Sequence, residues 1–191
     1  MKYKVGVFGS AVDEGDEVMA KARQVGEALG KFKEKIIVVT GACSGVPYEA
    51  AREAAKAGVT VWGYSPEFDV SGQKRFTPED DLSIYQRIVF VPRQFGFEDR
   101  PMVRKKYRNV ISTADCDGAI FIAGRWGTLH EFSSLVDYGG VCGVLTGTGG
   151  IAKELPQLDA KVKKAGSGKV IFDVDPAKLV KGVIDEISTK A

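Results

Sequence analysis

The sequence predicts an α/β fold: a doubly wound parallel sheet, Rossmann-like in its strand order, with helices on both faces. Short apolar runs rich in β-branched residues alternate along the chain with amphipathic or alanine-rich helical segments. The run Ile36–Val39 is apolar throughout, which is typical of a strand buried on both faces. A chain of 191 residues can bury one sizeable core, so we expect a single domain over residues 1–191.

The individual elements follow from these patterns. Expected strands span residues 4–8, 36–39, 59–64, 88–91, 119–123, 141–145 and 170–172. Expected helices span residues 16–32, 48–57, 102–113, 151–164 and 176–188, and one more begins at Thr128. Pro47 suits the start of the second helix and Gly58 its C-terminal end. Residues 65–86 lack a periodic pattern and predict a long loop. Within the sheet we expect strands 4–8 and 88–91 to be neighbours.

Composition excludes several classes of function. The 44% hydrophobic content and net charge of +2 are those of an ordinary globular protein, without a basic cluster that would indicate nucleic-acid binding. No stretch is long enough to span a bilayer, so we expect a cytoplasmic protein without membrane contact. The cysteines Cys43, Cys116 and Cys142 are too few and too widely spaced for a disulfide framework. With His130 as the single histidine, we expect no metal site.

Residues 117–138 contain the strongest functional signal. A buried strand leads into a turn in which Gly124 and Gly127 allow positive φ and close approach of a ligand. Thr128 then suits the N-cap of an amphipathic helix. Because the N-terminus of a helix presents free N–H groups and a positive dipole end, this arrangement predicts an anion site. Glu131 lies one turn into the helix and could act on the bound ligand.

A purely structural interpretation of the same residues stays open. Thr128 and Glu131 have the spacing of a capping box, in which both side chains only satisfy the first N–H groups of the helix. The arrangement of the other glycine-containing turns supports a ligand-binding site over the purely structural interpretation. Gly9-Ser10, Thr40–Gly45 (which includes Gly41) and Ala123–Thr128 each follow a strand, so the parallel sheet should bring them to one rim.

Two common ligand classes fit this rim poorly. Neither G-x-G-x-x-G nor G-x-x-x-x-G-K-[ST] is present, which argues against a dinucleotide cofactor and against a P-loop nucleotidase, and we expect no cofactor. Cys43 lies in a turn ahead of a helix and is either an activated thiolate or, more simply, a packed small residue.

The chain resembles the Lonely Guy (LOG) superfamily of nucleotide phosphoribohydrolases, also labelled lysine decarboxylase-like. It is most similar to the branch that contains molybdenum cofactor carrier proteins. The resemblance covers about residues 3–150 and depends on Gly9-Ser10, the glycine-rich turn 40–45 and the G-x-x-G-T-x-x-E sequence at 124–131. Nothing in the sequence marks a lysine for pyridoxal phosphate, so decarboxylation is not expected.

The resemblance also implies a functional arginine on the helix before the central strand. By spacing it is Arg108, followed by Asn109, a pair typical of the carrier-like branch. Arg104, followed by Lys105, is the second choice, and the two arginines are one helical turn apart. The chain departs from the family at Ala123, where a proline is usual and the change should cost little. It also departs at Arg125, where a glycine is usual; this arginine could clamp a phosphate or fill the pocket.

The family chemistry would be hydrolysis of the N-glycosidic bond of a nucleoside 5′-monophosphate, with Glu131 and Arg108 as the catalytic residues. The alternative is a carrier that binds a nucleotide or pterin phosphate without turnover. The implied substrate-binding residues are Gly9, Ser10, Gly41, Gly45, Arg104, Asn109, Gly124, Arg125, Gly127 and Thr128. The implied partner is a small phosphorylated molecule. Phe132 and Tyr138 look exposed, and with the resemblance they predict a homodimer or larger homo-oligomer.

Overall fold

A computed structural model describes residues 2–162 and 168–190. The sheet has seven parallel strands in the order β4-β3-β2-β1-β5-β6-β7, which confirms the predicted fold class. The strands are β1 (Tyr3–Gly9), β2 (Ile36–Thr40), β3 (Thr60–Tyr64), β4 (Arg87–Val89), β5 (Gly118–Ile122), β6 (Val141–Leu145) and β7 (Val170–Asp173). The helices are α1 (Asp16–Gly30), α2 (Val46–Lys56), α3 (Val70–Phe76), α4 (Pro101–Ala114), α5 (Trp126–Asp137), α6 (Gly150–Lys161) and α7 (Pro176–Lys190), with the 3-10 helix η1 at Leu82–Ile84.

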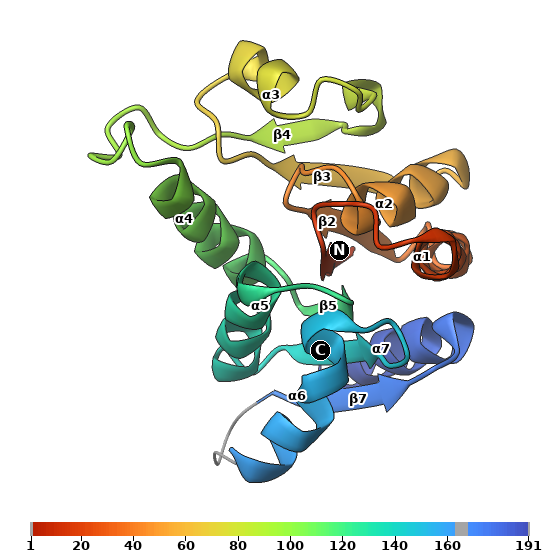
Figure 1. The fold of residues 1–191 in the computed structure, drawn as a ribbon. Helices are drawn as coiled ribbons and strands as arrows, with labels where there is room; N and C mark the ends of the chain where they lie inside the picture. Colours follow the sequence, from red (N-terminus) through yellow and green to blue (C-terminus); the bar gives the residue numbers. More distant parts are fainter. Residues whose placement is uncertain (1, 163–167, 191) are drawn as a thin grey trace.

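Helices cover both faces of the sheet. One layer contains α1, α2 and α7, and the other contains α4, α5 and α6 (Figure 1). Each layer closes its own hydrophobic cluster, the larger one beneath α1, α2 and α7. The smaller cluster lies beneath α5 and α6, where the ring of Phe121 packs between those of Phe8 and Phe132. Strands β5 and β6 are buried along their whole length, as expected for strands packed on both faces.

The expected pairing of strands 4–8 and 88–91 was wrong. β1 pairs with β2 and β5, whereas β4 pairs with β3 and forms the edge of the sheet. The chain adds β2, β3 and β4 outward on one side of β1 before α4 carries it back to β5 on the other side. The strand order therefore reverses between β1 and β5, one strand later in the chain than expected. In such sheets the crevice beyond the strand ends at this reversal is the usual binding site.

The segment 65–86 is more regular than expected. It holds α3 and η1, and the Asp69 side chain caps α3 by accepting from the N–H of Gly72 at 2.9 Å. Gln73 of α3 is fully buried, and its Nε2 donates to the carbonyl oxygen of Ala42 at 2.9 Å. A seven-residue helix contains too few turns for a periodic pattern, which is why the sequence did not reveal it.

Most helix boundaries agree with the predictions. Pro47 lies in the first turn of α2, and Gly58 follows α2 with a φ of 88°. The helix expected at 151–164 ends at Lys161, and residues 163 and 164 lie outside the described part of the chain. None of the helices in the described ranges is both long and apolar enough to cross a membrane.

One premise of the predicted oligomer fails. Phe132 is 5% exposed, because its ring packs against Phe121 at a centroid distance of 5.4 Å. Tyr138, at the end of α5, is 52% exposed, as expected. The homodimer stays a prediction that depends on the family resemblance.

Candidate functional site

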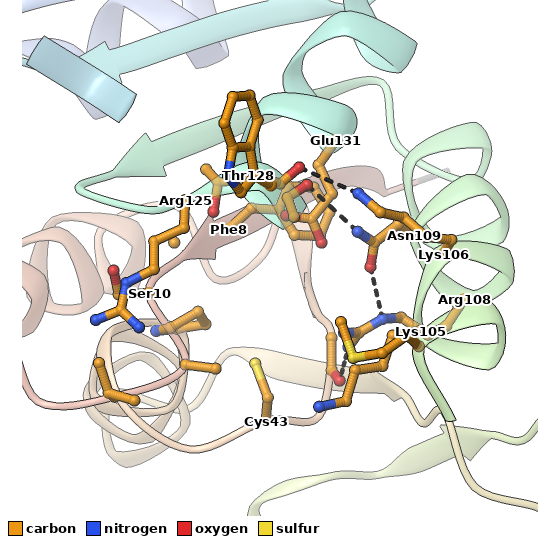
Figure 2. Close-up of a pocket in the computed structure, with 18 residues that line it drawn as sticks. Phe8, Ser10, Cys43, Lys105, Lys106, Arg108, Asn109, Arg125, Thr128 and Glu131 are labelled. Carbon is orange, nitrogen blue, oxygen red and sulfur yellow. Dashed lines mark hydrogen bonds between the residues drawn. The ribbon is translucent and has the colours of Figure 1, made fainter. Parts of the chain in front are cut away.

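A cavity of about 230 Å³ lies where β1, β2 and β5 end, against α4 and the start of α5 (Figure 2). The turns expected to share a rim after β1, β2 and β5 all contribute to it. Of the residues predicted for the site, those that line the cavity are Gly9, Ser10, Gly41, Arg108, Asn109, Arg125, Gly127, Thr128 and Glu131. Gly45, Gly124 and Arg104 do not line it.

Gly45 and Gly124 shape the turns around the cavity. Both have positive φ, 80° and 93° respectively, where a side chain would be strained. A Cβ at Gly45 would overlap the backbone of Val12, and a Cβ at Gly124 would overlap the side chain of Thr128. The N–H of Gly124 donates to Ser10 Oγ at 3.1 Å, which joins the turn after β5 to the turn after β1. We infer that these glycines allow the turns after β1, β2 and β5 to approach one another closely around the cavity.

Arg104 is directed away from the cavity. Its Nε donates to the carbonyl oxygen of Pro66 at 3.0 Å, and its Nη2 lies 3.1 Å from a carboxylate oxygen of Glu67. Its guanidinium also lies 5.1 Å from the centre of the Phe68 ring. Arg104 therefore holds the segment after β3 against α4.

Arg108 lies inside the site and is 8% exposed. Its Nη1 donates to the carbonyl oxygen of Gly41, and to that of Tyr64 at 3.3 Å. Its Nε donates to Asn109 Oδ1 at 2.9 Å, and Asn109 Nδ2 donates to the carbonyl oxygen of Gly127 at 3.3 Å. These bonds join the turn after β2, helix α4 and the first turn of α5 across the cavity (Figure 2).

Helix α5 begins two residues before the predicted N-cap. Its N-cap is Arg125, without a side-chain capping bond, and the N–H of Leu129 donates to the carbonyl oxygen of Arg125 at 2.9 Å. Thr128 is therefore within the first turn, and Gly127 is helical and not in the left-handed region. The N-cap assigned to Thr128, the positive φ assigned to Gly127 and the capping-box interpretation of Glu131 were all wrong, because Gly124 turns the chain earlier than the sequence pattern suggested.

Glu131 is a buried carboxyl group on the wall of the cavity. It is 6% exposed, and no residue in the described ranges hydrogen-bonds its side chain. Burial raises its pKa to about 7, and the positive charges of Arg108 and Lys106 oppose that rise. A group with this pKa is divided between acid and base near neutral pH, which suits proton transfer.

The raised pKa of Glu131 has a measurable cost in stability. The folded protein holds this proton more tightly than the unfolded chain, so the free energy of unfolding falls as the pH rises from the ordinary pKa of 4.5 to about 7. Glu131→Gln removes this effect and should stabilise the protein by up to about 3 kcal/mol above pH 7, and by about 1 kcal/mol or less at pH 5. Urea unfolding at pH 5 and pH 8 measures the difference. An equal gain at both pH values would contradict the assigned pKa.

The mouth of the cavity is basic. Arg125 is exposed, and its Nη2 lies 3.4 Å from a carboxylate oxygen of Glu14, so it borders the opening and does not fill the pocket. Lys105 and Lys106 of α4 also line the cavity, and Lys106 Nζ donates to the carbonyl oxygen of Trp126 at 3.1 Å. Together with Arg108 these side chains form an electropositive site that favours an anionic ligand.

Strained backbone occurs at two of the turns. In the described part of the chain, the non-glycine residues with positive φ are Ala42 at 45°, in the turn after β2, and Ala123 at 50°, directly after β5. Proline fixes φ near −65°, so the family proline cannot occupy position 123 in this conformation. A proline at position 123 would therefore require a different turn, so the presence of alanine there is not a minor change. Burial raises the pKa of the Cys43 thiol, which favours its interpretation as a packed residue over an activated thiolate.

Two glycines, one in the site and one outside it, provide a matched test. A Cβ at Gly41 would overlap the guanidinium of Arg108, whereas a Cβ at Gly182, on α7, would lie 3.8 Å from Ile171, an ordinary contact. Gly41→Ala should displace Arg108 and reduce the affinity for a phosphorylated ligand by about 10-fold or more, and Gly182→Ala should change it by less than about 3-fold. Calorimetric titration with ribose 5-phosphate compares the two variants. Equal effects would show that Arg108 is not held against Gly41.

The sequence missed several lining residues, among them Phe8, Met102, Lys105, Lys106 and Trp126. Lys106 lies in the second turn of α4, a helix whose start was predicted, yet its side chain could not be placed before the packing of α4 on α5 was known. One signal was available in the sequence for these residues. It is the close spacing of basic and polar residues on one helix: Lys105, Lys106, Arg108 and Asn109. Among the described residues, no group of three His, Cys, Asp or Glu side chains is placed to hold a metal ion.

Comparison with known families identifies the family of the chain. The model described as SLOG cluster4 family matches residues 2–180. The chain belongs to the SLOG cluster4 family. This membership confirms the LOG-like resemblance inferred from the glycine turns and the G-x-x-G-T-x-x-E sequence. No curated protein sequence matches the SLOG cluster4 chain significantly.

Solved structures share the fold of the SLOG cluster4 chain along nearly its whole length. TM1055, a structural genomics target, matches with a TM-score of 0.71 and 20% identity, covering 97% of this chain and 99% of that one. The molybdenum cofactor carrier protein MCP from Chlamydomonas reinhardtii matches with a TM-score of 0.64 and 19% identity, covering 99% of each chain. The likeness to the carrier branch is therefore confirmed at the level of fold.

The expectation that excluded nucleic acid as a partner was wrong. DNA processing protein A from Helicobacter pylori, described for its single-stranded DNA binding mode, matches the SLOG cluster4 chain with a TM-score of 0.60 and 13% identity. That match covers 96% of this chain and 81% of the other. The fold is thus compatible with nucleic-acid binding. The premise that basic residues do not cluster also fails, since Lys105, Lys106, Arg108 and Arg125 all line one cavity.

Proposed function

We propose that this protein hydrolyses the N-glycosidic bond of a nucleoside 5′-monophosphate and releases ribose 5-phosphate, in the cytoplasm. The observation that carries the proposal is Glu131, a buried carboxyl group on the cavity wall with a pKa of about 7 and no hydrogen bond within the described residues. Structural carboxylates of this depth are normally paired or hydrogen-bonded. A buried carboxyl group without such a partner, beside a basic cavity, suits a general base.

The substrate phosphate fits the basic part of the cavity. The first turn of α5 has free N–H groups at its N-terminus, and Gly127 and Thr128 of this turn line the cavity. Arg108 adds a buried positive charge, and Lys105 and Lys106 add two more from α4. This arrangement supports binding of a phosphate monoester, because helix N-termini and guanidinium groups both favour anions.

Hydrolysis then needs one activated water. Glu131 in its ionised form takes a proton from water as the oxygen attacks C1′ of the ribose. The bond from C1′ to the base nitrogen breaks as the new C1′–O bond forms, and its electron pair leaves with the base, which takes up a proton from solvent. Positive charge develops on C1′ and the ring oxygen, as in other glycoside hydrolyses, and the carboxylate of Glu131 also stabilises that charge.

The direct test is incubation of the protein with a panel of purine and pyrimidine nucleoside 5′-monophosphates. Release of free base together with an equal amount of ribose 5-phosphate is the expected result, with the corresponding nucleosides as a control for phosphate dependence. Nucleosides hydrolysed as fast as their monophosphates would contradict the role of the basic cavity. Binding without hydrolysis for every nucleotide would contradict the proposed activity.

A carrier of a pterin phosphate or nucleotide is the second candidate. It is favoured by the hydrogen bonds of Arg108 and Asn109, which are directed to backbone carbonyls and so hold the walls of the site. Molybdenum cofactor carrier proteins share the fold, which makes a pterin phosphate a natural ligand class to test. In a carrier, Glu131 would contact the ligand without proton transfer, and Glu131→Gln would leave ligand retention unchanged.

A further inference from the structure

Trp126 stands at the mouth of the cavity with its side chain in solvent. It is 79% exposed, more than any other large apolar side chain in the described ranges, although it is the first residue of α5. Met102, on the opposing helix α4, also lines the cavity and is 66% exposed. Two large apolar side chains thus remain in water beside a basic cavity, where neither contributes to the core.

The backbone of Trp126 is held by hydrogen bonds, whereas the face of its indole ring is free for a ligand. Lys106 Nζ donates to the carbonyl oxygen of Trp126 at 3.1 Å, and Asn109 Nδ2 donates to that of Gly127 at 3.3 Å. Helix α4 therefore holds the first turn of α5 at two successive residues. Within the described ranges, no aromatic ring or cation packs on the indole of Trp126. A rigidly placed aromatic surface with a free face is suited to stacking.

The size of the cavity indicates which part of a ligand lies inside it and which part lies at its mouth. Its volume of about 230 Å³ is below the range of roughly 300–1,000 Å³ that encloses most organic ligands. A sugar phosphate within reach of Arg108 and Glu131 would occupy most of this space. Any ring attached to that sugar must then extend out of the cavity at its mouth, beside Trp126 and Met102.

We propose that Trp126, with Met102 at the opposite side of the mouth, forms the subsite for the flat heterocyclic ring of the phosphorylated ligand, outside the enclosed cavity. The inference rests on the proposed function and adds the place where the planar ring of the phosphorylated ligand binds. Trp126 recognises the ring by stacking, which tolerates different bases because each has a π-face. In hydrolysis, the base would then be released directly towards solvent.

The experiment separates ring binding from phosphate binding. Affinities for adenosine 5′-monophosphate and for ribose 5-phosphate are measured by calorimetry in a Glu131→Gln background, which removes the proposed turnover, with Trp126 retained and with Trp126→Ala and Trp126→Phe. Trp126→Ala should weaken binding of the nucleotide by about 10-fold or more and that of ribose 5-phosphate by less than about 2-fold, and Trp126→Phe should restore most of the loss. Equal losses for both ligands, or none for either, would overturn the proposal.

Tryptophan fluorescence provides a second readout. The sequence contains two tryptophans, and Trp62 lies on β3, beside Lys4 and Arg87 in a separate hollow. In a Trp62→Phe background, the nucleotide should quench the remaining emission and ribose 5-phosphate should not. If that background does not fold, the same quench should be present in wild type and absent in Trp126→Phe. A nucleotide that binds without quenching overturns the stacking.

The outcomes distinguish this inference from the proposed activity. Ring-dependent binding without release of ribose 5-phosphate overturns the hydrolase and supports the subsite. Hydrolysis that is unaffected by Trp126→Ala at subsaturating nucleotide overturns the subsite alone. If Trp126→Ala instead changes the molecular mass in light scattering and leaves nucleotide affinity unchanged, Trp126 belongs to a contact between two copies of the chain and the subsite is overturned.

Discussion

Glu131→Gln should reduce turnover of a nucleoside 5′-monophosphate by about 100-fold or more while nucleotide affinity stays within about 3-fold of wild type. General base catalysis typically contributes about 10² to 10⁴ in rate, and the amide of glutamine cannot accept the proton from water. The two side chains have nearly the same shape, so the cavity should keep its form. Single-turnover rates and calorimetric affinities, measured on the same preparations, separate catalysis from binding.

The pH profile and a control variant make this result specific. In wild type, kcat/KM should rise through an apparent pKa near 7, the value that burial gives Glu131, and this rise should be absent from the residual activity of Glu131→Gln. Glu14 provides the matched control, because its carboxylate borders the same mouth beside Arg125. Glu14→Gln should keep turnover within a few-fold. A Glu131→Gln enzyme with wild-type turnover would eliminate the general base and favour the carrier.

Arg108→Ala should weaken binding of ribose 5-phosphate by about 10- to 100-fold, the loss expected for a hydrogen bond to a charged group of about 1.5–3 kcal/mol. Arg108 is buried on the cavity wall, and its guanidinium also supports the turn after β2 through the carbonyl oxygen of Gly41. The measurement is calorimetric titration at two salt concentrations, because the charge of the buried Arg108 is screened less than those of the partly exposed Lys105 and Lys106.

Arg104→Ala is the control for Arg108. The two arginines belong to one helix and are equally buried, yet Arg104 pairs with Glu67 and the backbone of Pro66, away from the cavity. Arg104→Ala should therefore lower the melting temperature, since it leaves the partly buried carboxylate of Glu67 unpaired, and should leave ligand affinity within about 2-fold. If Arg104→Ala weakens binding as much as Arg108→Ala, the assignment of Arg108 as the ligand-binding arginine is wrong.

Much of the fold could be predicted from local patterns. Strands such as Val141–Leu145 are apolar at nearly every position, and helices such as α2 carry a proline at the start and a glycine after the end. These signals depend on neighbouring residues only, and the sequence contains them in full. The carboxyl-end rim was predictable for a related reason, because parallel strands place all their following turns at one edge.

The errors arose where a distant part of the chain decides the outcome. The pattern Thr128-x-x-Glu131 is compatible with a helix start at Thr128, but the left-handed Gly124 and its bond to Ser10 start the helix at Trp126. The edge position of β4 depends on where the chain crosses the sheet, which no local pattern records. Arg104 and Arg108 are one turn apart and chemically identical, so only the packing around each one separates their roles.

Helix α4 supplies Lys105, Lys106, Arg108 and Asn109 to the cavity, and it packs mainly on α5, with little contact to the sheet. The site therefore has one wall that is joined to the sheet side of the cavity mainly through the side chains of Arg104 and Arg108. A ligand that bridges α4 and α5 adds its binding free energy to the docking of α4, and by thermodynamic reciprocity a firmer docking of α4 raises ligand affinity by the same factor.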